Sequence, residues 1–288
     1  MQKAVKSQSA MEYLMTYGWA ILAIAIVMVS LYSLGIFNLG SLQPTATPGS
    51  CQVLRTGGQT SLAGQCSNLL PKYVVTVARA NSQYIKATTT TGLPLGAKPF
   101  TMSVWVKTPT SGANMVIAQF GTATTYGSAH IWDDNGNHVN VGFYGDNYIS
   151  SSTVNDGKWH NIVFVYNGST TSVIGYVDNV QFTGTVSAAG NIQSGNVLIG
   201  YDDSGLNDYW NGQIANLQIY NISFDATQVK ALYTEGIGGS PINPQNIVGW
   251  WPLNGNDNDY SGNDNQGVAN GAIVWTASWQ AGYTAPTS

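Results

Sequence analysis

Charged side chains are scarce in this sequence. Asp, Glu, Lys and Arg together make up 8% of the 288 residues, against roughly a quarter in ordinary soluble proteins. The 10 basic and 14 acidic residues leave a net charge of −4, and Arg55 and Arg79 are the only arginines. A nucleic-acid-binding protein needs a basic face that displaces counterions, so this composition excludes that class. The hydrophobic fraction of 43% supports a core and excludes a disordered chain.

Charge is missing altogether between Glu12 and Arg55. Residues 13–37 form a mostly apolar stretch without proline, about 37 Å long as a helix, which is enough to cross a bilayer core of about 30 Å. A secretory signal has an apolar stretch of only about 7–15 residues. The simplest prediction is therefore a single-pass anchor. Lys3 and Lys6 precede the stretch, which places residues 1–7 in the cytoplasm and the rest of the chain outside.

The residues around the start of this stretch carry a more specific signal. Residues 6–14 are KSQSAMEYL and residues 15–22 are MTYGWAIL; together they resemble the class III signal peptide of archaeal type IV pilin-like proteins. The resemblance implies that a prepilin-type peptidase cuts between Ser7 and Gln8, although the family usually has glycine where Ser7 stands. It also implies a helix over residues 8–40 that is inserted in the membrane before assembly and packs with copies of itself in an extracellular filament.

Glu12 would be the fifth residue of the cleaved chain, which is the place of the acid in type IV pilins. A carboxylate inside an apolar helix is costly unless it is paired, and the new α-amine of a neighbouring subunit would supply the opposite charge. The alternative is that Glu12 lies at the level of the lipid headgroups, or simply favours the positive end of its helix dipole.

Residues 41–66 are predicted to be a linker that contains a disulfide loop. Pro44, Pro48 and Gly49 indicate a spacer without regular structure. Cys51 and Cys66 are the only cysteines. Outside the cell such a pair most simply forms a disulfide, which stabilises by about 3 kcal/mol for a loop of this size. A two-cysteine metal site is the weaker alternative, because no histidine lies near in sequence.

Residues 67–288 show short alternating strands separated by turns, which predicts one antiparallel β-sandwich domain. Strands 159–166 and 171–177 are expected to pair across Asn167-Gly168, and Asp178-Asn179 to turn the chain into the next strand. Further strands are expected at 100–106, 115–120, 138–144, 196–201, 213–220, 247–253 and 268–275. One helix is predicted over 226–235, with Asp225 and Gln228 as its capping box. The fold class is thus mainly β, with an N-terminal hydrophobic α-helix and one short helix.

Several segments of the predicted sandwich resemble the laminin-G-like, concanavalin-A-like lectin/glucanase jelly roll. They are FTMSVWV at 100–106, DGKWH at 156–160, YVDN at 176–179, GQIANLQIYN at 212–221 and VGWWPL at 248–253. The last segment usually opens such domains, and here it closes the chain, as a circular permutation would. The resemblance implies a lectin-like domain that binds glycans or partner surfaces.

The sequence does not indicate an enzyme. Glucanases of this fold resemble one another in a strand with two glutamates around an aspartate, which act as nucleophile and acid/base. The only glutamates here are Glu12 and Glu235, and each is assigned to a helix. The pairs Asp133-Asp134 and Asp202-Asp203 are expected in solvated turns. His130, His138 and His160 form no recognisable catalytic arrangement, and His160 follows Trp159 as it does in non-enzymatic relatives.

Calcium is a possible ligand of the segment 257–265, DNDYSGNDN. Its oxygen-bearing side chains suit a hard cation: Asp257, Asp259, Ser261, Asn263 and Asp264. The resemblance places calcium at Asp259, Ser261 and Asn263, but the acidic pair that relatives use before Tyr220 is replaced by Ala215 and Asn216. A plain Asx turn is an equally good interpretation.

Aromatic side chains beside predicted loops are candidates for a sugar-stacking platform; they are Trp132, Tyr144, Tyr148, Tyr209 and Trp210. Asn167 and Asn221 begin glycosylation sequons. The predicted function is a pilin-like cell-surface filament subunit that displays an adhesion domain for glycans or partner surfaces. The alternative is a membrane-tethered lectin or polysaccharide-acting enzyme that does not polymerise. A coat that binds only its neighbours also remains open.

Overall fold

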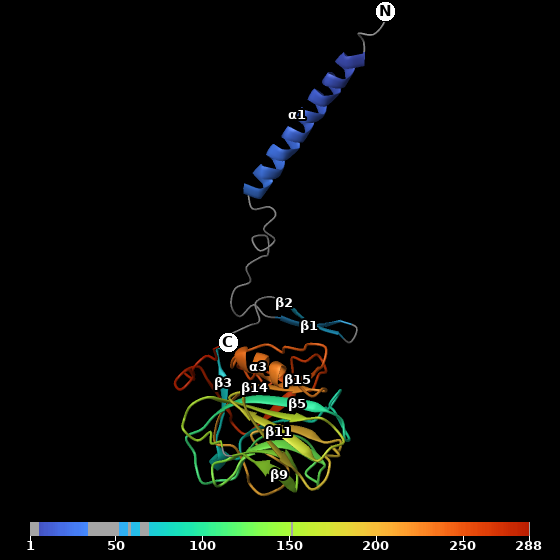
Figure 1. Ribbon diagram of the computed structural model, residues 1–288. Helices are drawn as coiled ribbons and strands as arrows, with labels where there is room; N and C mark the ends of the chain where they lie inside the picture. The colour runs from blue at the N-terminus through green and yellow to red at the C-terminus, as the bar shows by residue number, and fades with distance from the viewer. Residues whose placement is uncertain (1–5, 34–51, 57–58, 64–68, 151, 288) are drawn as a thin grey trace, which may run out of the picture. The chain divides into compact units, whose positions relative to one another are not determined.

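The computed structural model describes residues 6–33, 52–56, 59–63, 69–150 and 152–287 (Figure 1). The chain divides into two compact units, Met1–Ala46 and Thr47–Ser288, which are described separately below. Cys51 and Cys66 lie outside the described residues, so their disulfide stays a prediction, as do the predicted domain boundaries.

The first unit contains helix α1, Lys6–Ser33. Its described side chains are exposed, and the large hydrophobic ones among them lie on all sides of the helix: Met15, Tyr17, Trp19, Ile21, Leu22, Ile24, Ile26, Val27, Met28 and Val29. Ser7, Gln8 and Glu12 lie in this helix. Within the described residues, no helix is both long enough and apolar enough to cross a bilayer. The predicted membrane stage and cleavage stay predictions.

The second unit is a sandwich of two antiparallel sheets, which confirms the predicted fold class. The eight-stranded sheet has the order β12-β11-β10-β5-β14-β3-β17, and β15 also pairs with β14. Its strands are β3 (Val74–Val77), β5 (Phe100–Lys107), β10 (His160–Tyr166), β11 (Ser172–Val177), β12 (Val180–Thr185), β14 (Gly212–Tyr220), β15 (Ile247–Trp251) and β17 (Val274–Thr276).

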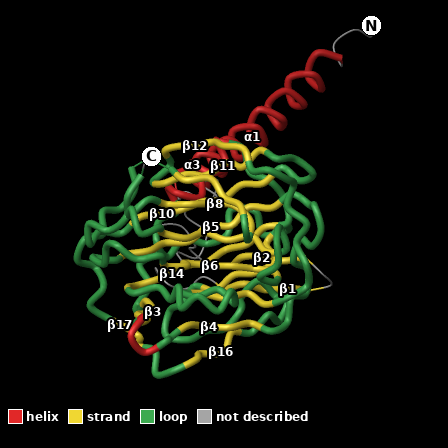
Figure 2. Tube along the Cα trace, turned by 90° about the horizontal axis from the view of Figure 1, so that it is seen from below, coloured by secondary structure: helices red, strands yellow, loops and turns green. Residues whose placement is uncertain are grey.

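The other sheet has seven strands in the order β16-β4-β13-β6-β7-β8-β9. They are β4 (Tyr84–Ala87), β6 (Met115–Gly121), β7 (Ser128–Asp133), β8 (Val139–Phe143), β9 (Asp146–Ile149), β13 (Asn196–Ile199) and β16 (Gly267–Asn270). The strands cross the middle of the domain and the loops gather at its sides (Figure 2). A separate hairpin pairs β1 (Gln52–Thr56) with β2 (Gln59–Ala63).

The core lies between the two sheets and follows from the alternation of side chains along each strand. On β5, Phe100, Met102, Val104 and Val106 are fully buried in it. The Phe100 ring meets Phe120 of the opposite sheet edge to face, with ring centroids 5.0 Å apart. Apolar burial between the sheets therefore fixes which face of each strand remains outside.

The outer face of the eight-stranded sheet is also covered. Helix α3 (Ala226–Thr234) begins with the predicted capping box, because the Asp225 carboxylate accepts from the Gln228 backbone and the Gln228 amide oxygen accepts from the Asp225 backbone. Val229 and Leu232 pack on this sheet face. Trp279, near the end of the chain, is fully buried and donates its indole N–H to the Pro71 carbonyl at 2.9 Å.

Most predicted strands are present, and one is wrong. Segment 268–275 is divided into β16 and β17, which belong to different sheets. Gly271, with φ +77°, lies between them. The predicted pairing of β10 with β11 is confirmed, with Ile162 opposite Val177, and Asp178 and Asn179 both have positive φ, as a tight hairpin turn requires.

Candidate functional site

A groove of about 570 Å³ opens at one end of the sandwich. Its lining comes from two segments that are distant in sequence. One is the 3₁₀ turn η1 (Arg79–Asn81) with the residue after it, and the other is the segment that enters β14. The lining residues are Arg79, Ala80, Ser82, Asn207, Tyr209 and Asn211. The two segments are joined where the Arg79 backbone N–H donates to the Asn211 amide oxygen at 3.3 Å.

The Tyr209 ring belongs to a stack of tyrosine rings. The rings of Tyr201 and Tyr209 are nearly parallel, with centroids 4.2 Å apart and 11° between their planes, and Tyr84 lies 4.9 Å from Tyr201. Burial and the neighbouring Tyr209 raise the pKa of Tyr201 to about 12, so its hydroxyl keeps its proton at neutral pH. The stack fixes the Tyr209 ring in place before any ligand arrives.

Arg79 supplies the only positive charge of the groove lining. One guanidinium nitrogen donates to the Asn114 carbonyl, and another lies 4.0 Å from the Asp208 carboxylate. Burial and the nearby Asp202 raise the pKa of Asp208, while Arg79 opposes this shift. The Arg79 side chain remains 34% exposed. The guanidinium is therefore a positioned hydrogen-bond donor whose charge Asp208 partly balances.

Strands β6 and β7 of the seven-stranded sheet adjoin this groove through Tyr209. Val116 of β6 forms a bridge with Tyr209 and is opposite Trp132 of β7; the Trp132 ring lies 5.7 Å from that of His130. Burial lowers the pKa of His130 to about 4, so the imidazole is neutral at pH 7. Four buried polar atoms here have no hydrogen-bond partner among the described residues: both His130 ring nitrogens, the Trp132 indole nitrogen and Gln119 Oε1.

The structure separates the five predicted platform residues. Trp210 is fully buried in the core, which corrects its assignment to an exposed platform: Tyr209 faces out, so its neighbour faces in. Tyr148 packs on the core, with its ring 6.2 Å from that of Phe182. Tyr144 and Trp132 are partly exposed. Only Tyr209 lines the groove.

Sequence reasoning missed Arg79, Gln119 and the tyrosine partners of Tyr209, which no motif indicates. It also placed two acids wrongly, because Asp133 and Asp202 are buried rather than solvated. His160 is held between two carboxylates, with Nδ1 2.6 Å from Asp178 and Nε2 3.0 Å from Asp156. His138 lies 3.3 Å from Asp134. The described histidines thus do not come together as a catalytic group.

The segment predicted to bind calcium uses its oxygens within the protein. The Asp259 carboxylate accepts from the backbone N–H groups of Trp250, Ser261 and Asn265 and from the Ser261 hydroxyl, at 2.8–2.9 Å. The remaining predicted ligands are also engaged: Asp257 accepts from Ala269, Asn263 donates to Val248, and Asp264 accepts from Gln266. These residues do not fit a calcium site, because N–H and O–H donors occupy the carboxylate that would be its main ligand. They form a turn that closes onto β15.

The predicted glycosylation sites are both exposed. Asn167 lies in the turn after β10, and Asn221 follows β14. The Asn221 amide oxygen accepts from Asn246 at 2.9 Å, which orients the side chain with its nitrogen away from that contact. Glycosylation itself stays a prediction.

Comparisons with known proteins agree with this architecture. Residues 79–230, more than half of the chain, match the family model of the concanavalin A-like lectin/glucanases superfamily. A Bacteroides ovatus protein described as a candidate carbohydrate-binding protein has a similar structure, with 15% identity and a TM-score of 0.56 over 77% of this chain and 65% of its own. A heptameric pentraxin from Limulus polyphemus matches with 15% identity and a TM-score of 0.49, over 71% and 94% of the two chains. No curated protein matches the sequence significantly.

Two packed antiparallel sheets with an aromatic groove at one end define a lectin-like sandwich. The family match makes the assignment specific: the chain belongs to the concanavalin A-like lectin/glucanases superfamily. It spans 65% of the length of the Bacteroides ovatus protein. At 15% identity the structural likeness establishes the fold alone.

Proposed function

We propose that this chain is a pilin-like cell-surface filament subunit whose sandwich domain binds a neutral glycan in the Arg79–Tyr209 groove. The observation that carries the binding role is the pre-stacked Tyr209 ring at the edge of a groove lined with a guanidinium, amides and a hydroxyl. A flat aromatic face suits the apolar face of a sugar ring. The amide, hydroxyl and guanidinium groups suit its hydroxyls.

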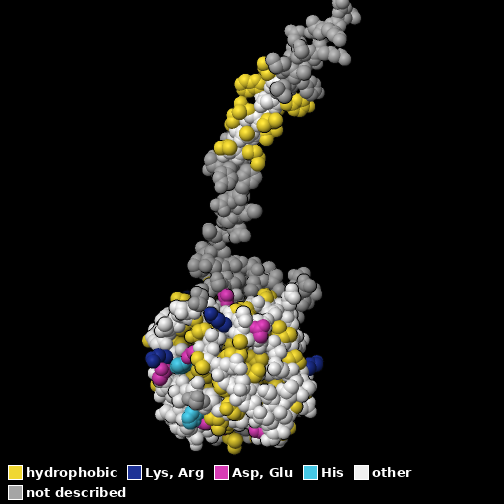
Figure 3. Space-filling model, viewed as in Figure 1, with side chains coloured by type: hydrophobic (Ala, Val, Ile, Leu, Met, Phe, Trp, Pro, Cys, Tyr) yellow, Lys and Arg dark blue, Asp and Glu magenta, His cyan; other side chains and the backbone are white. Residues whose placement is uncertain are grey.

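The charges of the groove favour a neutral ligand. Arg79 is balanced by Asp208, and Asp202 and Asp203 belong to the same loop. These carboxylates are not among the lining residues, but their negative charge beside the groove would disfavour an acidic sugar. Binding should therefore change little with salt, since no net charge is neutralised on association. The face shown in Figure 3 likewise carries few charged side chains.

The assembly role rests on helix α1. Large apolar side chains are exposed on all its sides, and such a surface is stable only against lipid or other apolar helices. A bundle of identical helices would bury it. The resemblance of residues 6–22 to pilin-like proteins supports this arrangement and gives Glu12 its partner, the cleaved α-amine of a neighbouring subunit.

The binding role is tested with the full-length chain in detergent, applied to immobilised cellulose, xylan, mannan and chitin. Tyr209→Ala should weaken binding at least tenfold, equivalent to about 1.4 kcal/mol. Tyr260→Ala is the matched control, because Tyr260 is also an exposed tyrosine but lies in the 257–265 turn. Equal binding by the Tyr209 and Tyr260 variants would exclude the groove. Release of soluble sugars would instead favour the enzyme.

The assembly role is tested on protein recovered from the cell surface. Intact mass should give Gln8 as the first residue, and Glu12→Ala should reduce the filament yield while the sandwich remains folded. A chain that starts at Met1, or a wild-type yield from the Glu12 variant, contradicts this part of the proposal and leaves the binding role intact.

A further inference from the structure

Asp133, the last residue of β7, carries a buried carboxylate of which only one oxygen has a hydrogen-bond partner. Asp133 is fully buried. Its Oδ2 accepts from the Asn155 amide nitrogen at 2.6 Å. Its Oδ1 is sealed from solvent and has no hydrogen-bond partner among the described residues. An unpaired buried carboxylate oxygen is expensive, so a further group is expected to contact it.

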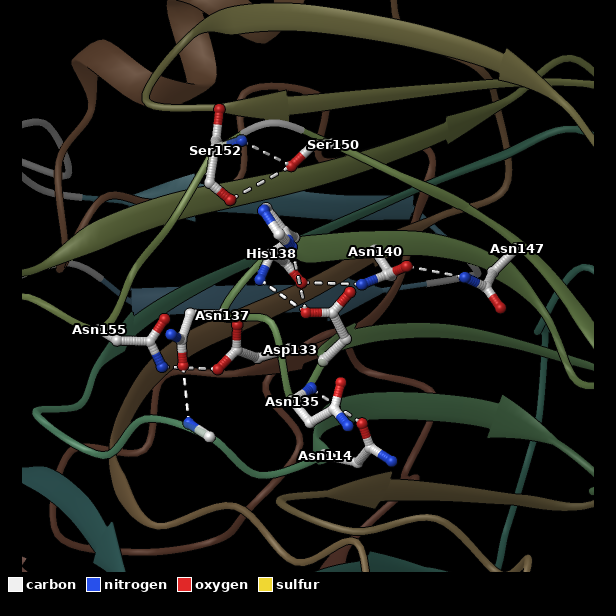
Figure 4. A network of polar contacts seen from close by, with 12 residues as sticks. Asn114, Asp133, Asn135, Asn137, His138, Asn140, Asn147, Ser150, Ser152 and Asn155 are labelled. Carbon is white, nitrogen blue, oxygen red and sulfur yellow. Dashed lines mark hydrogen bonds and ion pairs between the residues drawn. The ribbon is translucent and has the colours of Figure 1, made fainter.

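Asn155, which donates to Asp133, carries a second unsatisfied oxygen. Its amide nitrogen donates to both Asp133 and the Thr110 carbonyl, which fixes the orientation of the side chain. Its Oδ1 is also buried without a partner among the described residues. In Figure 4 the two unsatisfied oxygens lie on the same side of the hydrogen bond that joins Asn155 to Asp133.

The surroundings of this pair are negative. Asp134, the next residue, adds a second carboxylate. The His138 ring nitrogen lies 3.3 Å from the Asp134 carboxylate. In the described part of the chain, no lysine or arginine forms an ion pair with either aspartate. The Asp133 carboxylate thus lacks a compensating positive charge.

We propose that Asp133 Oδ1 and Asn155 Oδ1 are ligands of a calcium ion. Carboxylate and amide oxygens are the ligands that calcium takes, and loop carbonyls and water complete its shell of six to eight. The surrounding loops carry Asn114, Asn135 and Asn137 (Figure 4). The amide oxygens of Asn114 and Asn137 already accept from the Asn135 and Gly112 backbone N–H groups, so the remaining ligands would be backbone carbonyls and water. This site is distinct from the 257–265 turn, where the protein itself occupies the Asp259 carboxylate. With one buried carboxylate, the expected Kd is about 10⁻⁴–10⁻³ M, as in extracellular modules.

The test is a titration of the full-length chain in detergent at pH 7.5 with CaCl₂, followed by calorimetry, and with Tb³⁺, followed by luminescence excited through tryptophan. Trp132 adjoins Asp133 in sequence, so bound Tb³⁺ should be sensitised. Asp133→Asn should weaken calcium binding at least tenfold. Asp264→Asn, in the 257–265 turn, is the matched control and should leave it unchanged.

Asn155→Asp keeps the test decisive if the Asp133 variant does not fold. A second carboxylate at this position should tighten calcium binding at least tenfold, and the melting temperature of this variant should depend more steeply on calcium than that of the wild type. Calcium binding that is lost in the Asp264 variant but not in the Asp133 variant overturns the proposal. So does the absence of binding to all four proteins, the wild type and the three variants, in which case a proton or a water molecule satisfies the two oxygens.

Discussion

The imidazole of His160 connects two loops, and its removal should destabilise the sandwich in a pH-dependent way. Nδ1 contacts Asp178, in the turn between β11 and β12, and Nε2 contacts Asp156, in the loop before β10. The side chain is 14% exposed. Hydrogen bonds to charged groups contribute about 1.5–3 kcal/mol each. Because Asp156 is 42% exposed and screened by solvent, we expect His160→Ala to cost about 2–3 kcal/mol in total.

The sign of the pH dependence follows from the two pKa shifts. Burial opposes protonation of His160, but its hydrogen bonds to Asp178 and Asp156 outweigh burial and raise its pKa. This stabilisation is complete below the unfolded value of about 6.5 and is lost as the pH rises through the folded pKa. Burial of Asp156 is likewise outweighed by its hydrogen bonds with His160 and Lys158, which lower its pKa. That contribution is present above about pH 3.9 and is lost as the pH falls.

The full effect is therefore expected between about pH 4 and 6.5. Thermal melts of the wild type and His160→Ala should differ by about 4–12 °C at pH 5.5, since 1 kcal/mol shifts the melting temperature by about 2–4 °C in a domain of this size. The difference should narrow by pH 9. His138→Ala is the control, because that ring is 41% exposed beside Asp134. A constant difference from pH 5 to 9 would falsify the assignment of His160 as a charged bridge.

Three further substitutions test the packing. Trp279→Ala should cost about 3–5 kcal/mol in urea unfolding, because the ring is fully buried, donates to Pro71 and lies 5.9 Å from Trp159; a cost below 1 kcal/mol would mean that the C-terminal segment does not seal the sheet. Gly184→Ala should cost about 1–3 kcal/mol of stability, since a new Cβ would lie 1.8 Å from the Tyr148 ring. Gly205→Ala is the comparison: its Cβ would meet open space, and only its positive φ of +79° would strain the new side chain. Asp225→Ala should cost about 0.5–2 kcal/mol through loss of the α3 cap, and unchanged stability would show that tertiary packing alone holds this helix.

Local signals in the sequence were sufficient for the elements whose pairing is local. The β10–β11–β12 hairpins and the α3 capping box follow from turn residues and caps a few positions apart. Segment 268–275 could not be predicted correctly, because its two halves pair with β4 and β3, which lie about 180–200 residues earlier. Pairing at that distance leaves no local pattern.

The candidate site was less predictable than the fold for the same reason. Tyr209 and Trp210 are equally aromatic neighbours, and only the bridge to Val116 and the position of the core decide which one faces out. Asp133 and Asp134 are adjacent acids, so the sequence predicted a solvated turn, whereas Asp133 is the last residue of β7. In the structure Asp133 is buried, and Asn155, from the loop before β10, donates to its carboxylate; no local pattern indicates this contact.

Strand β3 also has a mechanical consequence. It lies between β14 and β17 and is hydrogen-bonded to both. The chain that precedes the sandwich leads into β3, and Arg79 of the groove lies two residues beyond its end. Tension on the preceding chain would therefore load β3 along its axis, in shear against two neighbours at once, so that both ladders must break together before the strand yields. The groove lies close to the point where the load enters the domain. The lifetime of a bound ligand under tension would therefore depend on the resistance of β3 as well as on the contacts between ligand and groove.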